Sequence, residues 1–229
     1  MPLLLEVIVQ TMADARAAAA GGADRLEVVR EIERGGLTPS LDLVRAMSAE
    51  VGLPLRVMVR ENDGFTVADA GELARLQDAF AALAELGVDG AVVGFARGRE
   101  LDLETTAALL GSAPALQATF HRAFDEALDP FQAIAALRKM PQVDRILTTG
   151  GAGDWHARAR LLEQYTSVAG ATLTVLPGGN LDADGLRILT ASGCVREGHV
   201  GRAACEPPVP GAPVSEERVR HLKAACSGT

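Results

Sequence analysis

The chain has 229 residues, 48% of them apolar and 23% charged, and a formal net charge of −8. This length and composition are typical of a globular protein with one sizeable core. The sequence has no Lys/Arg-rich run and no interleaving of basic with aromatic residues, so no nucleic-acid partner is expected. No segment approaches the ~20 apolar residues that span a bilayer, so no membrane partner is expected either.

The cysteines and the first residues indicate the compartment. Cys194, Cys205 and Cys226 are an odd number without zinc-site spacing, which favours a reduced, cytoplasmic setting. Residues 1–9 carry Glu6 within an apolar run and lack a basic start. This pattern predicts a strand instead of a signal peptide.

In chain order, short apolar runs alternate with longer helical patterns. The apolar runs predict strands over residues 3–9, 25–29, 53–59, 90–94, 115–120, 145–149, 171–176 and 195–200. The helical patterns predict helices over residues 12–20, 40–50, 71–86, 131–140, 156–165, 182–192 and 216–225. Before the second helix, Thr38 suits an N-cap and Pro39 the first helical position.

Strands that alternate with helices pair in parallel through right-handed crossovers. Eight such units without a second zone of composition predict an α/β protein with a single (β/α)8 TIM barrel, one domain over residues 1–229. A weak repeat supports this: in residues 22–29, 87–94 and 142–150 a helix ends, an Asp follows and a strand begins. An open sheet of two βαβαβ halves is the alternative.

Side chains alternate across a strand, which predicts layers inside the barrel. From the bottom upward, the layers contain Glu6, Arg56, Gln117 and Thr174; Ile8, Met58, Thr119 and Leu176; and Gln10, Arg60, His121 and Gly178. The second and eighth strands add Arg25, Glu27, Glu197 and His199. Buried charges are costly unless paired. The expected structural network neutralises two glutamates with two arginines, namely Glu6 and Glu27 with Arg25 and Arg56.

Barrel active sites lie at the carboxyl ends of the strands. Arg60, His121 and His199 fall at such ends, and we expect them to converge on one cleft. With Glu27, they are the candidate catalytic residues.

The segment after the fifth strand offers two kinds of chemistry. His121 is followed by Arg122 and Asp125, so this segment can supply a proton shuttle and an anion clamp. A histidine with a purely structural role is the alternative.

Glycines follow the seventh and eighth strands, where barrels often bind phosphate through backbone N–H groups. The candidate anion site contains Gly178, Gly179, Gly201 and Arg202. Tight turns without a ligand are the alternative.

Five segments, at residues 22–28, 35–40, 56–65, 119–125 and 145–151, resemble the CutC family, which is named for copper homeostasis. The resemblance covers nearly the whole chain. It implies a cytoplasmic TIM-like barrel, often oligomeric, and an association with copper. The matching site positions are Glu6, Arg25, Glu27, Arg60, His121, Arg122, Asp125 and His199. Family members often have cysteines near the first two strands, where this chain has Ile8, Val9, Val28 and Val29.

Three functions remain open at this point. The first is a copper-handling protein without turnover, and copper is implied by the resemblance alone. The second is an enzyme that acts on a small anionic substrate, for example a phosphorylated one. In it, His121 or His199 would serve as acid and base, and arginines would bind the anion. The third is a barrel in which Glu6, Glu27 and a histidine hold a divalent metal, because carboxylate and imidazole suit harder metals than thiolates do.

Overall fold

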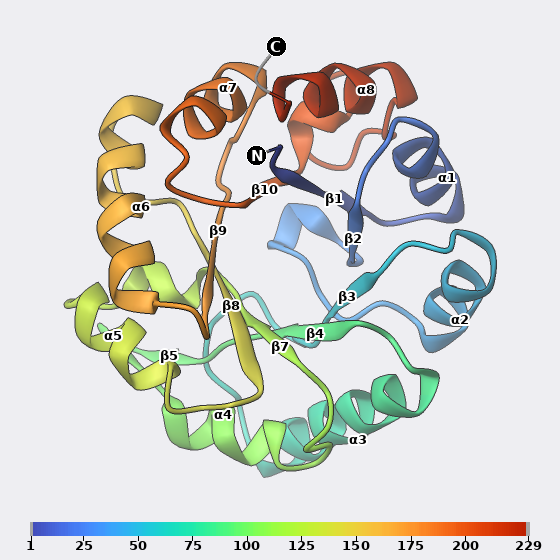
Figure 1. Ribbon diagram of the computed structural model, residues 1–229. Helices are drawn as coiled ribbons and strands as arrows, with labels where there is room; N and C mark the ends of the chain where they lie inside the picture. Colours follow the sequence, from blue (N-terminus) through green and yellow to red (C-terminus); the bar gives the residue numbers. More distant parts are fainter. Residues whose placement is uncertain (1, 228–229) are drawn as a thin grey trace.

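The computed structural model describes residues 2–227, so the expected domain limits at residues 1 and 229 lie outside the described residues. The barrel strands are β1 (Leu4–Val9), β2 (Arg25–Val28), β3 (Leu55–Met58), β4 (Gly90–Val93), β7 (Ala118–Phe120), β8 (Val143–Thr148), β9 (Thr174–Pro177) and β10 (Glu197–Val200). The helices around them are α1 (Met12–Ala20), α2 (Leu41–Glu50), α3 (Ala70–Leu86), α4 (Leu103–Leu110), α5 (Pro130–Leu137), α6 (Trp155–Ala169), α7 (Ala183–Ser192) and α8 (Glu216–Ala225). Figure 1 shows these helices as an outer ring around the strands.

The strands follow one another around the barrel in chain order. The hydrogen-bonded order is β10-β1-β2-β3-β4-β7-β8-β9, and every neighbouring pair is parallel. β9 and β10 lie next to each other and complete the ring. An open doubly wound sheet would reverse its strand order midway. The order therefore excludes that alternative and confirms the predicted TIM barrel.

The helices begin where the sequence supplies a capping oxygen. In all eight α-helices of the described residues, an Asp, Ser or Thr side chain accepts a hydrogen bond from a backbone N–H of the first turn. The predicted start of α2 was wrong. Ser40, not Thr38, is the cap, because the Thr38 hydroxyl is bonded to the backbone N–H and carbonyl of Arg60.

One small element had no sequence signal. Two-residue strands β5 (Ala96–Arg97) and β6 (Glu100–Leu101) form an antiparallel hairpin between β4 and α4. The Ala96 N–H donates to the carbonyl of Phe65 at 2.8 Å, so the hairpin supports the loop after β3. Strands of two residues are too short for a hydrophobic period to mark them.

Two different cores result from the alternation of side chains along the strands. The large apolar core, which includes Val7, Leu26 and Val57, lies between the strands and the helices. The barrel interior instead holds a small apolar cluster of Val29, Met58 and Val92 together with buried charged residues. In the described part of the chain, no helix combines the length and apolar character needed to cross a membrane.

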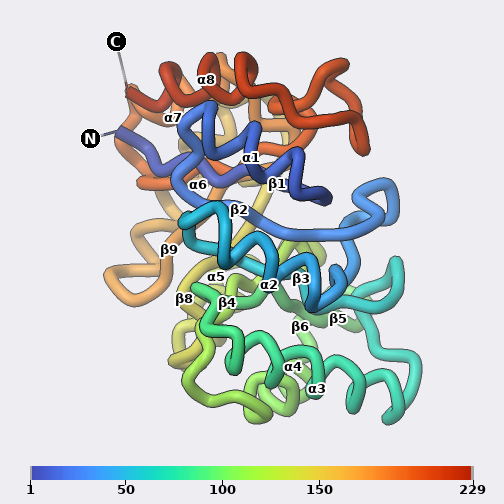
Figure 2. The backbone as a smooth tube through the Cα atoms, turned by 90° about the vertical axis from the view of Figure 1, so that its right-hand side faces the viewer, coloured from blue at the N-terminus to red at the C-terminus, as the bar shows by residue number. Residues whose placement is uncertain are grey.

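The two ends of the barrel are formed by different parts of the chain. Figure 2 views the barrel from the side, with the start of β1 and the end of α8 at one end and the loops that follow the strands at the other. The loops at this second end, which we call the mouth, surround the cavity described next.

Candidate functional site

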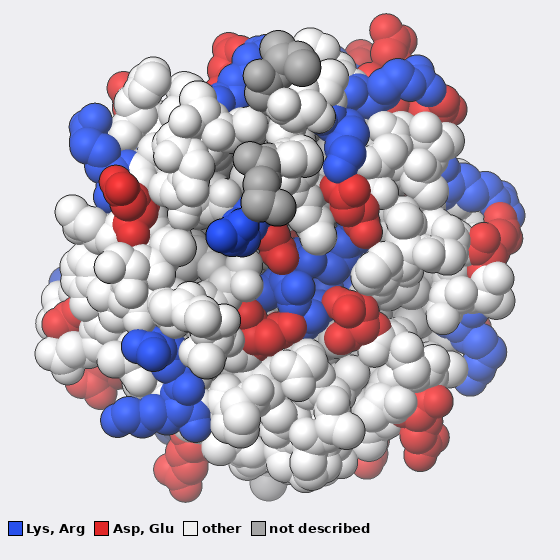
Figure 3. Space-filling model, in the orientation of Figure 1, with Lys and Arg blue, Asp and Glu red and all other residues white. Residues whose placement is uncertain are grey.

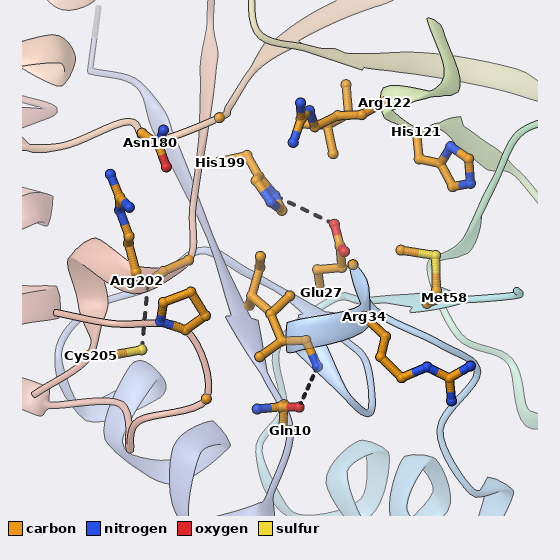
Figure 4. A pocket seen from close by; sticks show the side chains of 18 of the residues that line it. Gln10, Glu27, Arg34, Met58, His121, Arg122, Asn180, His199, Arg202 and Cys205 are labelled. Carbon is orange, nitrogen blue, oxygen red and sulfur yellow. Dashed lines mark hydrogen bonds and ion pairs between the residues drawn. The ribbon is translucent and has the colours of Figure 1, made fainter. Parts of the chain in front are cut away.

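A cavity of about 440 Å³ opens at the mouth of the barrel. Eight of the predicted site residues line it: Glu27, Arg60, His121, Arg122, Gly179, His199, Gly201 and Arg202. Figure 4 shows Glu27 and His199 in the middle of this group, with residues from distant parts of the chain around them. The expected convergence of Arg60, His121 and His199 on one cleft is therefore present.

The floor of the cavity is a buried pair of residues, Glu27 and His199. His199 Nδ1 lies 2.7 Å from Glu6 Oε1 and 3.5 Å from Glu27 Oε2. Glu27 is 3% exposed, and its Oε2 has no hydrogen-bond partner among the described residues. An unpartnered buried carboxylate oxygen is costly and marks a place where a proton, a ligand or an ion can be bound.

The two residues of this pair are both shifted toward their protonated forms. Burial raises the pKa of Glu27 to about 7, although the attraction of His199 opposes this shift. Burial would lower the pKa of His199, but the attraction of Glu27 and the hydrogen bond to Glu6 outweigh it and raise that pKa. The pair can therefore take up and release a proton close to neutral pH.

Glu6 lies directly beneath this pair and is itself paired downward. Arg25 Nε donates to Glu6, and Arg25 Nη2 donates to Glu197 at 2.5 Å. Burial acts to raise the pKa of Glu6, but Arg25 and His199 outweigh it and hold that pKa well below its ordinary value. Neither Glu6 nor Arg25 lines the cavity. The predicted ligand-binding role of Arg25 is therefore wrong for direct contact, because Arg25 is fully enclosed between carboxylates. Glu6 could reach a bound ion only together with Glu27 and His199, whose ligand atoms lie beside its own.

The bottom of the barrel is closed by a second group of charges. Arg56 donates to Asp89 at 2.6 Å and to both carboxylate oxygens of Asp144 at 2.9 and 2.7 Å. Arg145 links Asp144 to Glu197. Figure 3 looks at this end and shows basic side chains at its centre with acidic ones around them. The expected pairing of Arg56 with the upper glutamates was wrong, because the Asp residues of the repeat lie closer to it.

His121 is held in one orientation by its surroundings. Its Nδ1 accepts a hydrogen bond from the Ala123 N–H at 3.1 Å, at the start of the short helix η2 (Arg122–Glu126). Burial, together with the charges of Arg60 and Arg122, lowers the pKa of His121 to about 3. A histidine that is neutral and already accepting at Nδ1 is a poor proton shuttle near neutral pH. The structure thus argues against that expected role.

Arg60 organises the loops at the mouth. Its guanidinium donates to the carbonyls of Gly35 and Gly64 at 3.2 Å and to that of Asp63. It also lies over the Phe65 ring, with Cζ 5.2 Å from the ring centroid. Three of its five N–H groups are therefore used on backbone, and its main role is to fix the loops that follow β2 and β3.

The candidate anion site is partly as expected. The Gly178 N–H donates to the Thr148 carbonyl at 2.9 Å, and Gly178 does not line the cavity. Gly178 was therefore wrongly expected to contact an anion. Gly179 and Asn180 do line it, and both have positive φ, +72° and +66°. Neither of their N–H groups has a hydrogen-bond partner among the described residues.

Arg202 begins the short helix η3 (Arg202–Ala204) on the other side of this turn. It is exposed, lines the cavity, and makes no ion pair with any described residue. Figure 4 shows its guanidinium directed toward Asn180. Arg202 therefore remains available to bind an anion at the rim.

Asp125 has a structural role instead of the predicted ligand-binding one. It does not line the cavity, and its carboxylate accepts from the Thr148 hydroxyl at 2.6 Å and from the Thr149 N–H. It also pairs with Arg122 at 3.3 Å. Asp125 therefore fastens η2 to the end of β8 and restrains the exposed Arg122.

Several residues of the cavity were missed by the sequence reasoning, among them Arg34, Phe65 and Asn180. Arg34 belongs to the short helix η1 (Ile32–Arg34), which the sequence pattern does not mark. Asn180 had a usable signal, because Asn after two glycines readily takes the left-handed conformation.

Comparison with known proteins supports the barrel fold and identifies the family of this chain. The model of the CutC family matches residues 3–204. A family protein CutC from Agrobacterium fabrum is 34% identical over 208 residues, which cover 89% of this chain and 81% of the relative. The copper homeostasis protein cutC homolog from Homo sapiens is 33% identical over 193 residues, covering 83% and 70%.

A crystal structure titled as a copper homeostasis protein CutC, from Streptococcus agalactiae, has a TM-score of 0.79 at 23% identity. It covers 88% of this chain and 98% of that one, and at this identity it shows the fold alone. The family match and the curated relatives span most of the sequence. This chain belongs to the CutC family.

Proposed function

We propose that the mouth of the barrel binds a small molecule that carries an oxyanion group, and that Glu27 and His199 exchange a proton with it. The observation that carries this proposal is the unpartnered, buried Oε2 of Glu27, 3.5 Å from His199 Nδ1, at the floor of a cavity. A carboxyl group with a pKa near neutrality is suited to general acid–base catalysis.

The rim supports the anionic part of the proposal. Arg34, Arg122 and Arg202 all line the cavity, and so do Gly179 and Asn180, whose N–H groups have no hydrogen-bond partner among the described residues. Guanidinium groups and adjacent backbone N–H groups are the donors that bind phosphate and carboxylate. An anion bound there would also attract protons to Glu27 and His199.

Calorimetry with inorganic phosphate tests this coupling. Phosphate binding measured in two buffers of different ionisation enthalpy should show proton uptake near neutral pH. Glu27→Gln should bind phosphate with less proton uptake, because His199 alone then remains to take up a proton. The absence of phosphate binding to the wild type would contradict the proposal, and so would uptake that is unchanged in Glu27→Gln.

Thermal stabilisation gives a second measurement. A hundredfold excess of phosphate over its Kd stabilises a protein by about 2.7 kcal/mol. We expect Arg202→Ala to lose most of this stabilisation. Arg45→Ala is the matched control, because Arg45 is exposed on α2 and pairs with Asp42 far from the rim.

Metal binding is a second candidate, favoured by one observation. Glu6, Glu27 and His199 place three ligand atoms within 4.8 Å of one another, and all three residues are buried. Two carboxylates and an imidazole suit a divalent metal of intermediate hardness, including Cu(II), but not Cu(I), which prefers sulfur. A human relative and the similar crystal structure are both named for copper homeostasis, and we propose that role for this chain as well.

Metal analysis of the purified protein, followed by Zn(II) and Cu(II) titration, tests this candidate. One ion per chain in the wild type and none in Glu27→Gln would support it. Equal binding by the two proteins would place the ion elsewhere and contradict it.

We also propose a cytoplasmic location, in keeping with three cysteines that form no disulfide. A homo-oligomer without a nucleic-acid or membrane partner remains our expectation. Sedimentation measurements would test the oligomeric state.

A further inference from the structure

We propose that His121 binds a carbonyl oxygen of the ligand as a neutral hydrogen-bond donor, and that Glu27 removes a proton from the carbon beside that carbonyl. This inference rests on the proposed function. It narrows the substrate class to small molecules that carry both an oxyanion and a carbonyl group.

The tautomer of His121 follows from its hydrogen bond. Because Nδ1 accepts from the Ala123 N–H at 3.1 Å, it cannot also carry a hydrogen. The hydrogen of the neutral ring must therefore be on Nε2. No partner for Nε2 is found among the described residues, and the side chain lines the cavity. His121 thus offers one donor that the protein itself does not use.

The ring is also fixed in place. The His121 N–H donates to the Val93 carbonyl at 2.7 Å, so the backbone is anchored to β4. A Cβ atom placed on Gly94 would lie 2.7 Å from His121 Nδ1, so a glycine is needed for this close approach. The rings of Phe65 and Phe120 flank the imidazole, with centroids 5.4 and 6.2 Å away. A donor fixed in this way needs little reorganisation during a reaction.

The charged groups around His121 favour its neutral form. Arg60 and Arg122 are the charged groups that act on it, and both are positive. The other cavity histidine is in the opposite situation, since Glu6 and Glu27 surround His199. When the environments of two titratable groups in one site shift their pKa values in opposite directions, the two groups are suited to different roles. His199 and Glu27 exchange the proton with the ligand, while His121 stays neutral and acts only as a hydrogen-bond donor.

The remaining lining residues limit the chemistry further. Among the described residues around the cavity there is no Lys, Ser, Thr or Tyr. The thiol of Cys205 is turned to the Gly201 carbonyl, and burial raises its pKa. A Schiff base or an attack by a hydroxyl or thiolate therefore has no suitable group. Proton transfer by the carboxylate and imidazole groups of the cavity is the reaction that we infer.

The step balances without a further reactant. At a pH where Glu27 is ionised, its carboxylate takes the proton, and the electrons of the broken C–H bond form a C=C bond. The electrons of the carbonyl π bond move to its oxygen, where the Nε2–H of His121 stabilises the negative charge. Return of a proton from Glu27 to the carbon restores the carbonyl. The minimal reaction is hydrogen exchange or inversion at that carbon.

Histidine side-chain NMR tests the state of His121 without any substrate. In 15N-labelled protein, the signal lost in His121→Gln should report a bare Nδ1 and a protonated Nε2. It should not titrate between about pH 5 and 8. A hydrogen on Nδ1 or titration of His121 in this range would overturn the inference.

Phosphoglycolate tests the ligand class, because its carboxylate resembles the charged enolate and its phosphate supplies the oxyanion. We expect it to bind tighter than inorganic phosphate, to weaken by about tenfold or more in His121→Ala, and to weaken less in His121→Gln, which keeps an N–H donor. Equal binding by wild type and His121→Ala would overturn the inference. So would phosphoglycolate binding no tighter than phosphate, although the proposed function would then stand. If neither probe binds, both fail.

Discussion

Glu6 and His199 face each other in register on the neighbouring strands β1 and β10, and a hydrogen bond of 2.7 Å joins Glu6 Oε1 to His199 Nδ1. This bond connects the cavity floor to the charges below it, because Glu6 is also paired with Arg25. The protonation of the floor therefore depends on a residue that does not itself line the cavity.

Replacing Glu6 by Gln should disturb both stability and His199. Gln leaves Arg25 with Glu197 as its remaining carboxylate partner, and breaking a buried ion pair costs about 3–5 kcal/mol. The pKa of His199 should fall, since Glu6 helps to raise it. Urea unfolding and an NMR titration of His199 measure the two effects. An unchanged His199 pKa would show that Glu27 alone sets it.

Because of Glu27 and His199, the free energy of unfolding should fall as pH rises through neutrality. Glu27, with a folded pKa of about 7 against an ordinary 4.5, binds more protons in the folded state between these values, and the raised pKa of His199 acts in the same direction. The stabilisation is present at low pH and is lost as pH rises through the folded pKa, by up to about 1.4 kcal/mol per pH unit per proton.

Glu27→Gln should flatten this part of the curve. Urea unfolding at several pH values from 5 to 9 is the measurement. Glu61→Gln is a control at a half-exposed glutamate in the loop after β3. A wild-type stability that rises over this range would contradict the prediction.

Arg158→Ala should weaken phosphate binding from a distance. Arg158 Nη1 donates to the Gly179 carbonyl at 3.1 Å, and its guanidinium lies over the Trp155 ring. Because the peptide unit is trans, holding this carbonyl on the side of α6 turns the next N–H, that of Asn180, to the opposite side. Calorimetry should show a lower affinity in Arg158→Ala and none of this loss in Arg160→Ala, an exposed arginine of the same helix.

Cu(I) binding should be weak. Cys205 and Met58 both line the cavity, but no cysteine belongs to the cluster of metal-ligating groups found among the described residues. Burial raises the pKa of Cys226 to about 11, so its thiol resists the deprotonation that ligation requires. Titration against a competing Cu(I) chelator, on wild type and Cys205→Ser, is the measurement. Tight, stoichiometric binding by both proteins would refute this expectation.

Much of the site could be predicted from strand periodicity. A period of two, applied to residues 4–9, 55–58 and 197–200, assigns Glu6, Arg56 and His199 to the barrel interior, and the structure buries all three. The same reasoning could not choose their partners. Arg56 reaches both Asp89, immediately before β4, and Asp144, near the start of β8, a relationship across the barrel that no local pattern contains.

The sequence by itself determined the barrel, the end at which the cavity opens and several of the residues that face it, because alternation of strands and helices and alternation along each strand are local properties of the chain. Only the tertiary structure decided what each residue does there. His121 and His199 are the same chemical group near strand ends, yet the arginines near one and the glutamates near the other help to shift their pKa values in opposite directions. The charged groups that shift these pKa values come from residues distant in sequence, so they surround the histidines only after the chain has folded.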